Sequence, residues 1–198
     1  MYLLEDSDYI DKYTVLKESE GGAPTYRVRG VFSRSNVVNK NNRFYPIEVM
    51  QETIELAKPL VESGSFVGEI EHPASPKINM DRISHKITKL EIMEDGAIVG
   101  EFIPAGPKKN DLISLIEDKI RFGVSTRGTG SVKKVRNNLG EEISEVLKGY
   151  QMRAIDIVHD PSAGTYPEVV SESYEIKTYF TVPNNFKAIW NDVFDKKL

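Results

Sequence analysis

Residues 123–130 read GVSTRGTG, and this run decides how the middle of the chain folds. Glycines on both sides of Ser125 suit a place where the backbone turns or approaches another group closely. The pattern predicts strands over 122–125 and 130–135 with a glycine-rich turn between them. Such a turn would present the Ser125 hydroxyl, and the backbone N–H groups after it, to a ligand.

Strands are the commonest elements expected on either side of this run. A clear hairpin is predicted across the turn Glu94-Asp95-Gly96. Alternating or apolar runs predict the remaining strands, and 137–146 is expected to be a polar loop. The full set of expected strands is 13–17, 26–32, 65–71, 83–93, 97–103, 122–125, 130–135, 147–158 and 174–182.

Three helices are predicted among these strands. The first starts at Pro46 and runs to residue 63, and Pro59 should bend or stop it. The second runs over 110–120 with Asn110 as its cap. The third covers 185–195 and carries an apolar stripe that suits core or subunit packing.

Strands and helices do not alternate regularly, which favours an α+β fold over a doubly wound sheet. A small, mainly antiparallel β-barrel with flanking helices is the simplest way to bury so many strands. A chain of 198 residues suits one core. We therefore expect one domain over 10–198, preceded by a mobile leader over 1–9.

Composition excludes several classes of protein. Apolar residues make up 39% and charged residues 28%, as in soluble globular proteins, and no segment resembles a secretory signal or a membrane span. The chain has no cysteine, so disulfides, thiol nucleophiles and thiolate metal sites are absent. A net charge of -4 argues against a nucleic-acid partner.

His72 lies where an apolar strand ends, directly before Pro73. Strand alternation places it on the apolar face with Ile70, and turns Glu69 and Glu71 towards water. An imidazole at the rim of a core is shielded on one side and open to a substrate on the other, as a general base should be. A structural histidine bonded to a carbonyl fits the same position.

Asp156 lies inside an apolar strand, AIDIV over 154–158. Burial of an ionised carboxylate costs several kcal/mol unless a partner compensates it. A histidine N–H, a backbone amide or an arginine would each serve. His159 follows shortly afterwards and is a reserve candidate for the third position, beside a catalytic serine and histidine.

A serine hydroxyl becomes a useful nucleophile when a base removes its proton and donors hold the oxyanion. Ser125, His72 and Asp156 could form such a set, although Ser125 also fits an ordinary turn. Arg127 offers five N–H donors close by. Its backbone N–H, or that of Gly128, could face an oxyanion or bind substrate.

Metal and cofactor sites are poorly supported. His72, Asp81 and His85 could be combined as metal ligands, but no tight ligand spacing is present. The triplet at 128–130 resembles part of a phosphate loop but lacks the lysine and the strand–helix context. We therefore expect neither a metal nor a cofactor.

Four separated motifs lie within about residues 26–165. The motifs are VVN at 37–39 with RFYP at 43–46, GEIEHP at 68–73, GVSTRG at 123–128 with GS at 130–131, and Asp156 with PSA at 161–163. In residues, order and spacing they resemble the motifs of the prohead serine proteases of T-even tailed phages, which are similar in fold to the herpesvirus assemblins.

The resemblance implies that His72 is the general base, Ser125 the nucleophile and Asp156 the third member of the triad. Assemblins use a second histidine in third place, so His159 stays open. The family's fold is a small β-barrel wrapped by helices. Its members act inside the procapsid, in the host cytoplasm, on scaffolding core proteins, on the major capsid protein and on themselves.

The family's cleavage pattern is apolar-X-Glu, and Leu3-Leu4-Glu5 matches it. We expect self-cleavage after Glu5 and a leader that blocks the cleft until it is cut. Ile143-Ser144-Glu145 is a second match. An acidic side chain before the cut requires a cationic pocket, for which the sequence offers Arg34, Arg43, Arg82 and Arg127.

Two rival hypotheses remain. One is a catalytically inactive structural protein of the same barrel fold, such as a scaffold or tail-tube subunit. The other is a metal-dependent hydrolase that uses His72 and His85. Under the protease hypothesis the chain forms a homo-oligomer and has neither a membrane nor a nucleic-acid partner.

Overall fold

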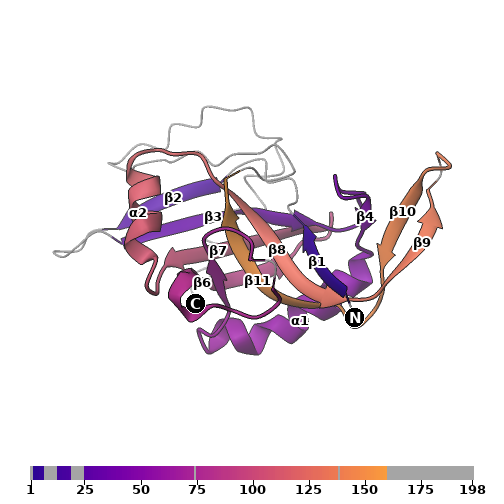
Figure 1. The fold of residues 1–198 in the computed structure, drawn as a ribbon, viewed down its shortest axis with the longest axis horizontal. Helices are drawn as coiled ribbons and strands as arrows, with labels where there is room; N and C mark the ends of the chain where they lie inside the picture. Colours follow the sequence, from indigo (N-terminus) through magenta and orange to yellow (C-terminus); the bar gives the residue numbers. More distant parts are fainter. Residues whose placement is uncertain (1, 7–12, 19–24, 74, 138, 160–198) are drawn as a thin grey trace.

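The computed structural model describes residues 2–6, 13–18, 25–73, 75–137 and 139–159. These residues form an α+β fold with mostly antiparallel strands, as predicted (Figure 1). The strand expected over 174–182 and the helix expected over 185–195 lie outside the described residues. Within the described chain, no helix is long and apolar enough to span a membrane.

The largest sheet has five antiparallel strands in the order β2-β3-β7-β6-β5. The hairpin of β6 and β7 across residues 94–96 is confirmed, and β2 pairs with β3 in the same antiparallel way. The strands are β2 (Tyr13–Glu18), β3 (Thr25–Arg34), β5 (Val67–Glu69), β6 (Ile83–Ile92) and β7 (Ala97–Pro104).

A second sheet has the order β1-β8-β11, with β1 (Tyr2–Asp6), β8 (Gly123–Gly130) and β11 (Gln151–Val158). The turn expected within 123–130 is therefore wrong: this run is one continuous strand, paired on both edges. Gly128 serves packing, because a Cβ there would lie 2.5 Å from the Tyr150 ring.

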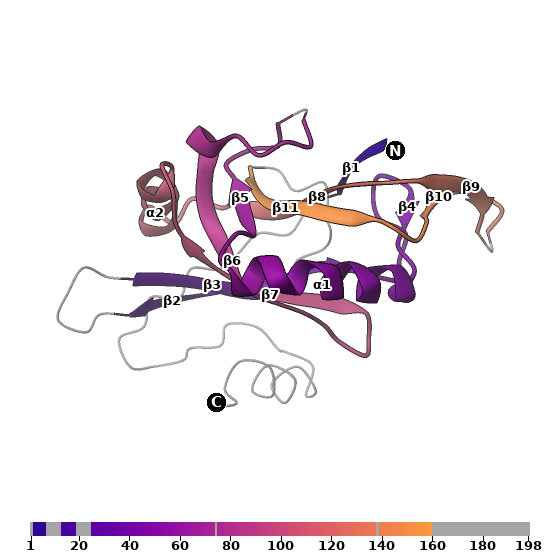
Figure 2. The ribbon, with the colours of Figure 1, turned by 90° about the horizontal axis from the view of Figure 1, so that it is seen from below.

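A third sheet joins β4 (Arg43–Phe44), β10 (Glu142–Val146) and β9 (Val132–Arg136). The β9–β10 hairpin extends from the body as an arm in both views (Figures 1 and 2). The polar loop expected over 137–146 is thus wrong in its second half, where β10 lies. Gly140, with a φ of 81°, lies in the connection between β9 and β10.

Two α-helices pack against the sheets in the described part of the chain. Helix α1 (Ile47–Glu62) contacts β6 and β11 and buries Val49, Ile54 and Ala57, so the helix predicted from Pro46 is confirmed. Pro59 lies in its last turn and does not stop it. Helix α2 (Lys109–Glu117) contacts β6 and β7. Asn110 is not its cap, because it lies one residue inside the helix.

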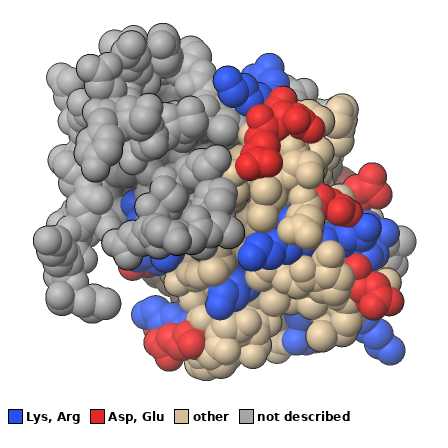
Figure 3. Space-filling view, turned by 90° about the vertical axis from the view of Figure 1, so that its left-hand side faces the viewer, with Lys and Arg blue, Asp and Glu red and all other residues tan. Residues whose placement is uncertain are grey.

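The expected closed barrel is not found among the described residues. Their strands form three sheets, each with two edge strands. A parallel bridge between Ile70 and Ile157 links the five-stranded sheet to the sheet of β8 and β11, and the Glu71 N–H donates to the Ile157 carbonyl at 2.7 Å. This link places the residues that follow β5 against β11, an edge strand of the second sheet. On the face in Figure 3, basic and acidic side chains are interspersed.

Candidate active site

The site lies where the end of β5 meets β11, which pairs with β8. Ser125 of β8 and Asp156 of β11 are direct cross-strand partners, so their side chains leave the sheet on the same face. Both residues are fully buried. His72 follows β5 and reaches this face through the bridge between the two sheets.

The backbone turns at Glu71, whose φ of 63° lies in the left-handed region. This turn interrupts the strand alternation assumed from the sequence. The expectation that Glu69 faces water is wrong: the pairing register shifts between Gly68 and Glu69, and Glu69 is fully buried, whereas Glu71 is exposed. Glu69 and His72 both reach the carboxylate of Asp156.

His72 bridges the other two predicted site residues. Its Nδ1 lies 2.8 Å from Oδ2 of Asp156, and its Nε2 is hydrogen-bonded to Oγ of Ser125. Because a carboxylate accepts, Nδ1 carries the proton, and Nε2 is left to accept from the Ser125 hydroxyl. The His72 side chain keeps 19% of its surface exposed, so it lies at the edge of the core.

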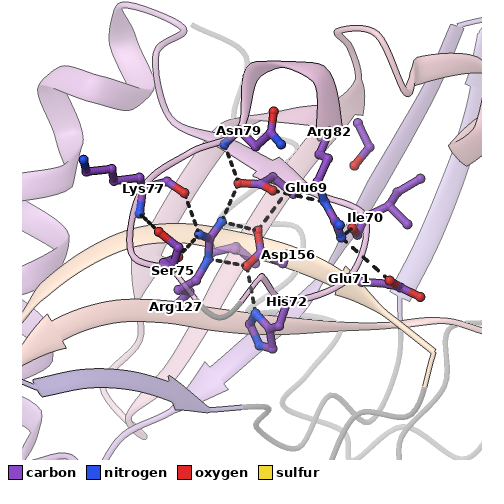
Figure 4. Close-up of polar contacts among 12 residues, drawn as sticks. Glu69, Ile70, Glu71, His72, Ser75, Lys77, Asn79, Arg82, Arg127 and Asp156 are labelled. Carbon is purple, nitrogen blue, oxygen red and sulfur yellow. Dashed lines mark hydrogen bonds and ion pairs between the residues drawn. The ribbon is translucent and has the colours of Figure 1, made fainter.

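Asp156 accepts four hydrogen bonds in addition to being buried (Figure 4). Its Oδ1 accepts from the Glu69 N–H at 3.0 Å and from Arg127 Nη2 at 3.1 Å, while Oδ2 accepts from His72 and from Arg127 Nε at 2.7 Å. All three kinds of partner considered from the sequence are therefore present together.

Together, the contacts of Asp156 affect its pKa more than its burial does. Burial on its own would raise the pKa of Asp156, but hydrogen bonds from His72 and Arg127, with the charge of Arg127, hold the pKa below its usual value. The pKa of Arg127 is raised: burial opposes its charge, and Asp156 and Glu69 overcome that effect. Both groups are thus ionised in the folded protein.

The alternative third residue, His159, lies one position beyond β11 and is exposed. In the part of the chain that the structure describes, no hydrogen bond joins it to His72. The other cations named for an acidic pocket lie at different places. Arg34 lies 3.6 Å from Asp95, Arg43 belongs to β4, and Arg82 lies 3.4 Å from Glu69.

His85, proposed as a metal ligand under one rival hypothesis, is fully buried on β6. Its Nε2 lies 2.8 Å from the Ile155 carbonyl, so it donates there, and Nδ1 accepts from the Ser84 hydroxyl at 2.8 Å. Both ring nitrogens are thus engaged. No cluster of three potential ligands that could hold a metal ion occurs among the described residues.

Acid should destabilise the protein through His85. Burial lowers the pKa of His85 from 6.5 to about 4, although Asp156 and the Ile155 carbonyl oppose this shift. As the pH falls from 6.5 towards 4, the unfolded chain binds a proton that the folded protein refuses. The free energy of unfolding should therefore fall by about 3 kcal/mol over this interval.

Urea denaturation at pH 7 and pH 4 measures this contribution. Other groups titrate in the same range, so the comparison is with His85→Gln, which lacks the titrating group. The difference in free energy of unfolding between the wild type and His85→Gln should become smaller as the pH falls. Parallel pH curves for the two proteins would contradict a buried, neutral His85.

Glu69 is the site residue that sequence reasoning missed. It accepts from Arg127 Nη2 at 2.9 Å and from the Asn79 N–H at 3.0 Å. A signal was present, because Arg127 and Asp156 both lie in strands with buried surroundings and neither could remain unpaired. That argument does not identify Glu69, which is 58 residues from Arg127 along the chain.

Known proteins resemble this chain in sequence and in fold. A family model described as prohead core protein serine protease matches residues 6–175. The chain therefore belongs to the prohead core protein serine protease family. It is a protease of phage capsid assembly, and the family resemblance noted in its motifs is confirmed.

A relative and a solved structure, both from phage T4, are similar to this chain. The prohead core protein protease of Enterobacteria phage T4 is 26% identical over 202 residues, which cover 93% of this chain and 91% of the relative. The solved structure of the bacteriophage T4 capsid assembly protease superposes with a TM-score of 0.68 at 20% identity, covering 79% of this chain and 96% of that one. The structural likeness supports the fold.

Proposed function

We propose that this protein is a serine endopeptidase that cleaves after glutamate during capsid maturation. Its substrates are scaffolding core proteins, the major capsid protein and its own chain, and it acts as a homo-oligomer inside the procapsid in the host cytoplasm. One observation carries the proposal: an unbroken hydrogen-bond chain runs from Ser125 through His72 to Asp156.

The reaction is acyl transfer. His72 Nε2 removes the Ser125 proton as Oγ attacks the carbonyl carbon of the glutamate, and the imidazolium then protonates the leaving amine. Water attacks the acyl enzyme with His72 again as base. Asp156 holds Nδ1–H, which keeps Nε2 free to accept and stabilises the cation that forms. The backbone N–H of Arg127, or that of Gly128, is the proposed oxyanion donor.

The substrate binds as an extended strand along β8, by the edge pairing common among peptide-binding proteins. In this structure β1 occupies that edge. It runs antiparallel, with Leu3 opposite Thr129, Glu5 opposite Arg127 and Asp6 opposite Thr126, the neighbour of Ser125. The leader's apolar-X-Glu motif therefore lies along β8 and points towards the nucleophile.

This arrangement supports a latent form of the enzyme. Ser125 is fully buried, so a substrate carbonyl reaches its Oγ only after covering residues move. Cleavage after Glu5 would release the strand that fills the β8 edge. The second motif is less accessible, because Ile143 is buried and Ser144 and Glu145 pair with both β4 and β9.

The proposed activity can be tested directly with two assays. Purified protein is incubated with peptides that contain one apolar-X-Glu site, and the products are located by mass spectrometry. Diisopropyl fluorophosphate is then used to label the active serine. We expect a single cut after glutamate, a label on Ser125, and full activity in a chelator.

Loss of activity in the chelator would favour the metal-dependent hydrolase. Absence of both cleavage and label, in folded protein freed of residues 1–6, would favour the inactive structural protein.

Glu5→Gln should prevent removal of the leader, because the amide lacks the charge that the proposed cationic pocket recognises. Intact-mass measurement of the purified protein should show residues 1–5 retained in this variant and lost from the wild type. Asp6→Asn is the matched control, since it makes the same carboxyl-to-amide change one residue beyond the cut. If Glu5→Gln and the wild type lose residues 1–5 to the same extent, the bond after Glu5 is excluded as a glutamate-specific cleavage site.

A further inference from the structure

The side chain of Arg127 is the most completely bonded group in the site. It is fully buried and forms a fork on Asp156, with Nε 2.7 Å from Oδ2 and Nη2 3.1 Å from Oδ1. Nη2 also donates to Glu69 at 2.9 Å, and Nη1 donates to the Ser75 carbonyl at 2.6 Å and the Lys77 carbonyl at 3.2 Å (Figure 4).

These contacts use all the donors that a guanidinium has. Arg127 carries five N–H groups, and five acceptor contacts surround them. No donor remains for the carboxylate of a substrate. The guanidinium is therefore engaged entirely by acceptors of the protein itself, and a role in the acidic pocket would break this set of bonds.

We propose that Arg127, braced by Glu69, is a positioning residue that orients Asp156 and, through it, His72. The inference rests on the proposed serine peptidase function. A bidentate fork fixes the plane of a carboxylate, which a single bond does not. The bonds to Ser75 and Lys77 also tie the segment that follows His72 to the same guanidinium.

Charge explains why a glutamate accompanies the arginine. Arg127 alone would cancel the charge of Asp156 and leave little to stabilise an imidazolium at His72. Glu69 restores a net charge of -1 to the buried trio of Glu69, Arg127 and Asp156. Beyond the trio, Arg82 lies beside Glu69 and Glu71 at the rim, and His85 is neutral.

Three variants separate the effect of the fork geometry from the effect of the charge of the trio. Arg127→Lys keeps the charge but loses the fork, Arg127→Met loses both, and Glu69→Gln keeps the Oε1 acceptor but makes the trio neutral. Arg29→Met is the control, because it removes a comparable partner of a buried glutamate, Glu101, from β3.

Two measurements are made on each protein. The first is the rate at which diisopropyl fluorophosphate labels Ser125, a reaction that requires the triad but no glutamate side chain. The second is kcat/KM on peptides with glutamate or glutamine before the cut, across pH. Thermal unfolding is recorded for every variant.

We expect Arg127→Lys and Arg127→Met to slow labelling by about tenfold to a hundredfold, with the glutamate-to-glutamine preference unchanged. Glu69→Gln should lower kcat and move the acid limb of kcat/KM to lower pH, since protonation of the base loses a stabilising charge. Arg29→Met should label at the wild-type rate. Should neither Arg127 variant fold, the pH profile of Glu69→Gln decides the matter.

Each result that contradicts the proposal would lead to a different conclusion. Wild-type labelling with a collapsed preference for glutamate would make Arg127 a substrate-binding residue. Wild-type labelling with only a lower unfolding temperature would make it a structural one. A wild-type protein that is never labelled, even when freed of residues 1–6, would overturn the proposed function itself, and the positioning role with it.

Discussion

Replacing Ser125 by alanine should lower the rate of cleavage at an apolar-X-Glu site by at least about a thousandfold, or about 4 kcal/mol of transition-state stabilisation. The Oγ atom is the partner of His72 Nε2, and no other hydroxyl is placed there by the hydrogen bonds of the described residues. Cleavage rates under single-turnover conditions measure the chemical step without product release.

Ser114→Ala is the matched control, because Ser114 is exposed on α2 and makes the same change of side chain. It should cleave at the wild-type rate. Ser125→Ala should also retain its leader during expression, which provides a second readout in the same preparation. Activity within tenfold of wild type, with unchanged circular dichroism, would contradict Ser125 as the nucleophile.

The proposed triad could be predicted from the sequence only with the family motifs, because the local patterns single out Asp156 and His72 without fixing their roles. Asp156 is a carboxylate in an apolar strand, and His72 stands where such a strand ends. Burial forces Asp156 to find partners, and the structure supplies them from β5 and β8. Family motifs then indicated which hydroxyl joins them.

The burial of Glu69 could not be inferred, because regular strand alternation fails in this segment. The pairing register shifts between Gly68 and Glu69, and Glu71 has a positive φ, which is uncommon for a glutamate. Nothing in the local sequence indicates either feature. Glu69 is buried against Arg127, a contact that strand alternation alone does not predict.

The glycines of β8 explain why the turn predicted within residues 123–130 is wrong. Runs of glycine usually mark turns, and GVSTRGTG therefore predicts one. In the structure, Gly128 instead gives the Tyr150 ring room to pack against an extended strand. A sequence does not distinguish a glycine that turns the chain from one that admits a neighbour, since both need a missing Cβ.

Asp156→Asn should reduce kcat by about a thousandfold to ten-thousandfold. Both carboxylate oxygens accept from two donors, so an amide NH₂ placed on either side faces donors. If it faces His72, Nδ1 must become the acceptor, the proton moves to Nε2, and Nε2 no longer accepts from Ser125. The variant should also unfold at a lower temperature, because Arg127 loses a buried counter-charge.

His159→Gln is the comparison that decides between the two candidates for third place. His159 is exposed and lies beyond the end of β11, so its replacement should leave kcat unchanged. Labelling of Ser125 by diisopropyl fluorophosphate, followed for both variants, separates loss of the triad from loss of substrate binding. A slow His159→Gln together with a fast Asp156→Asn would assign the orienting role to the histidine, despite the 2.8 Å contact between Asp156 and His72.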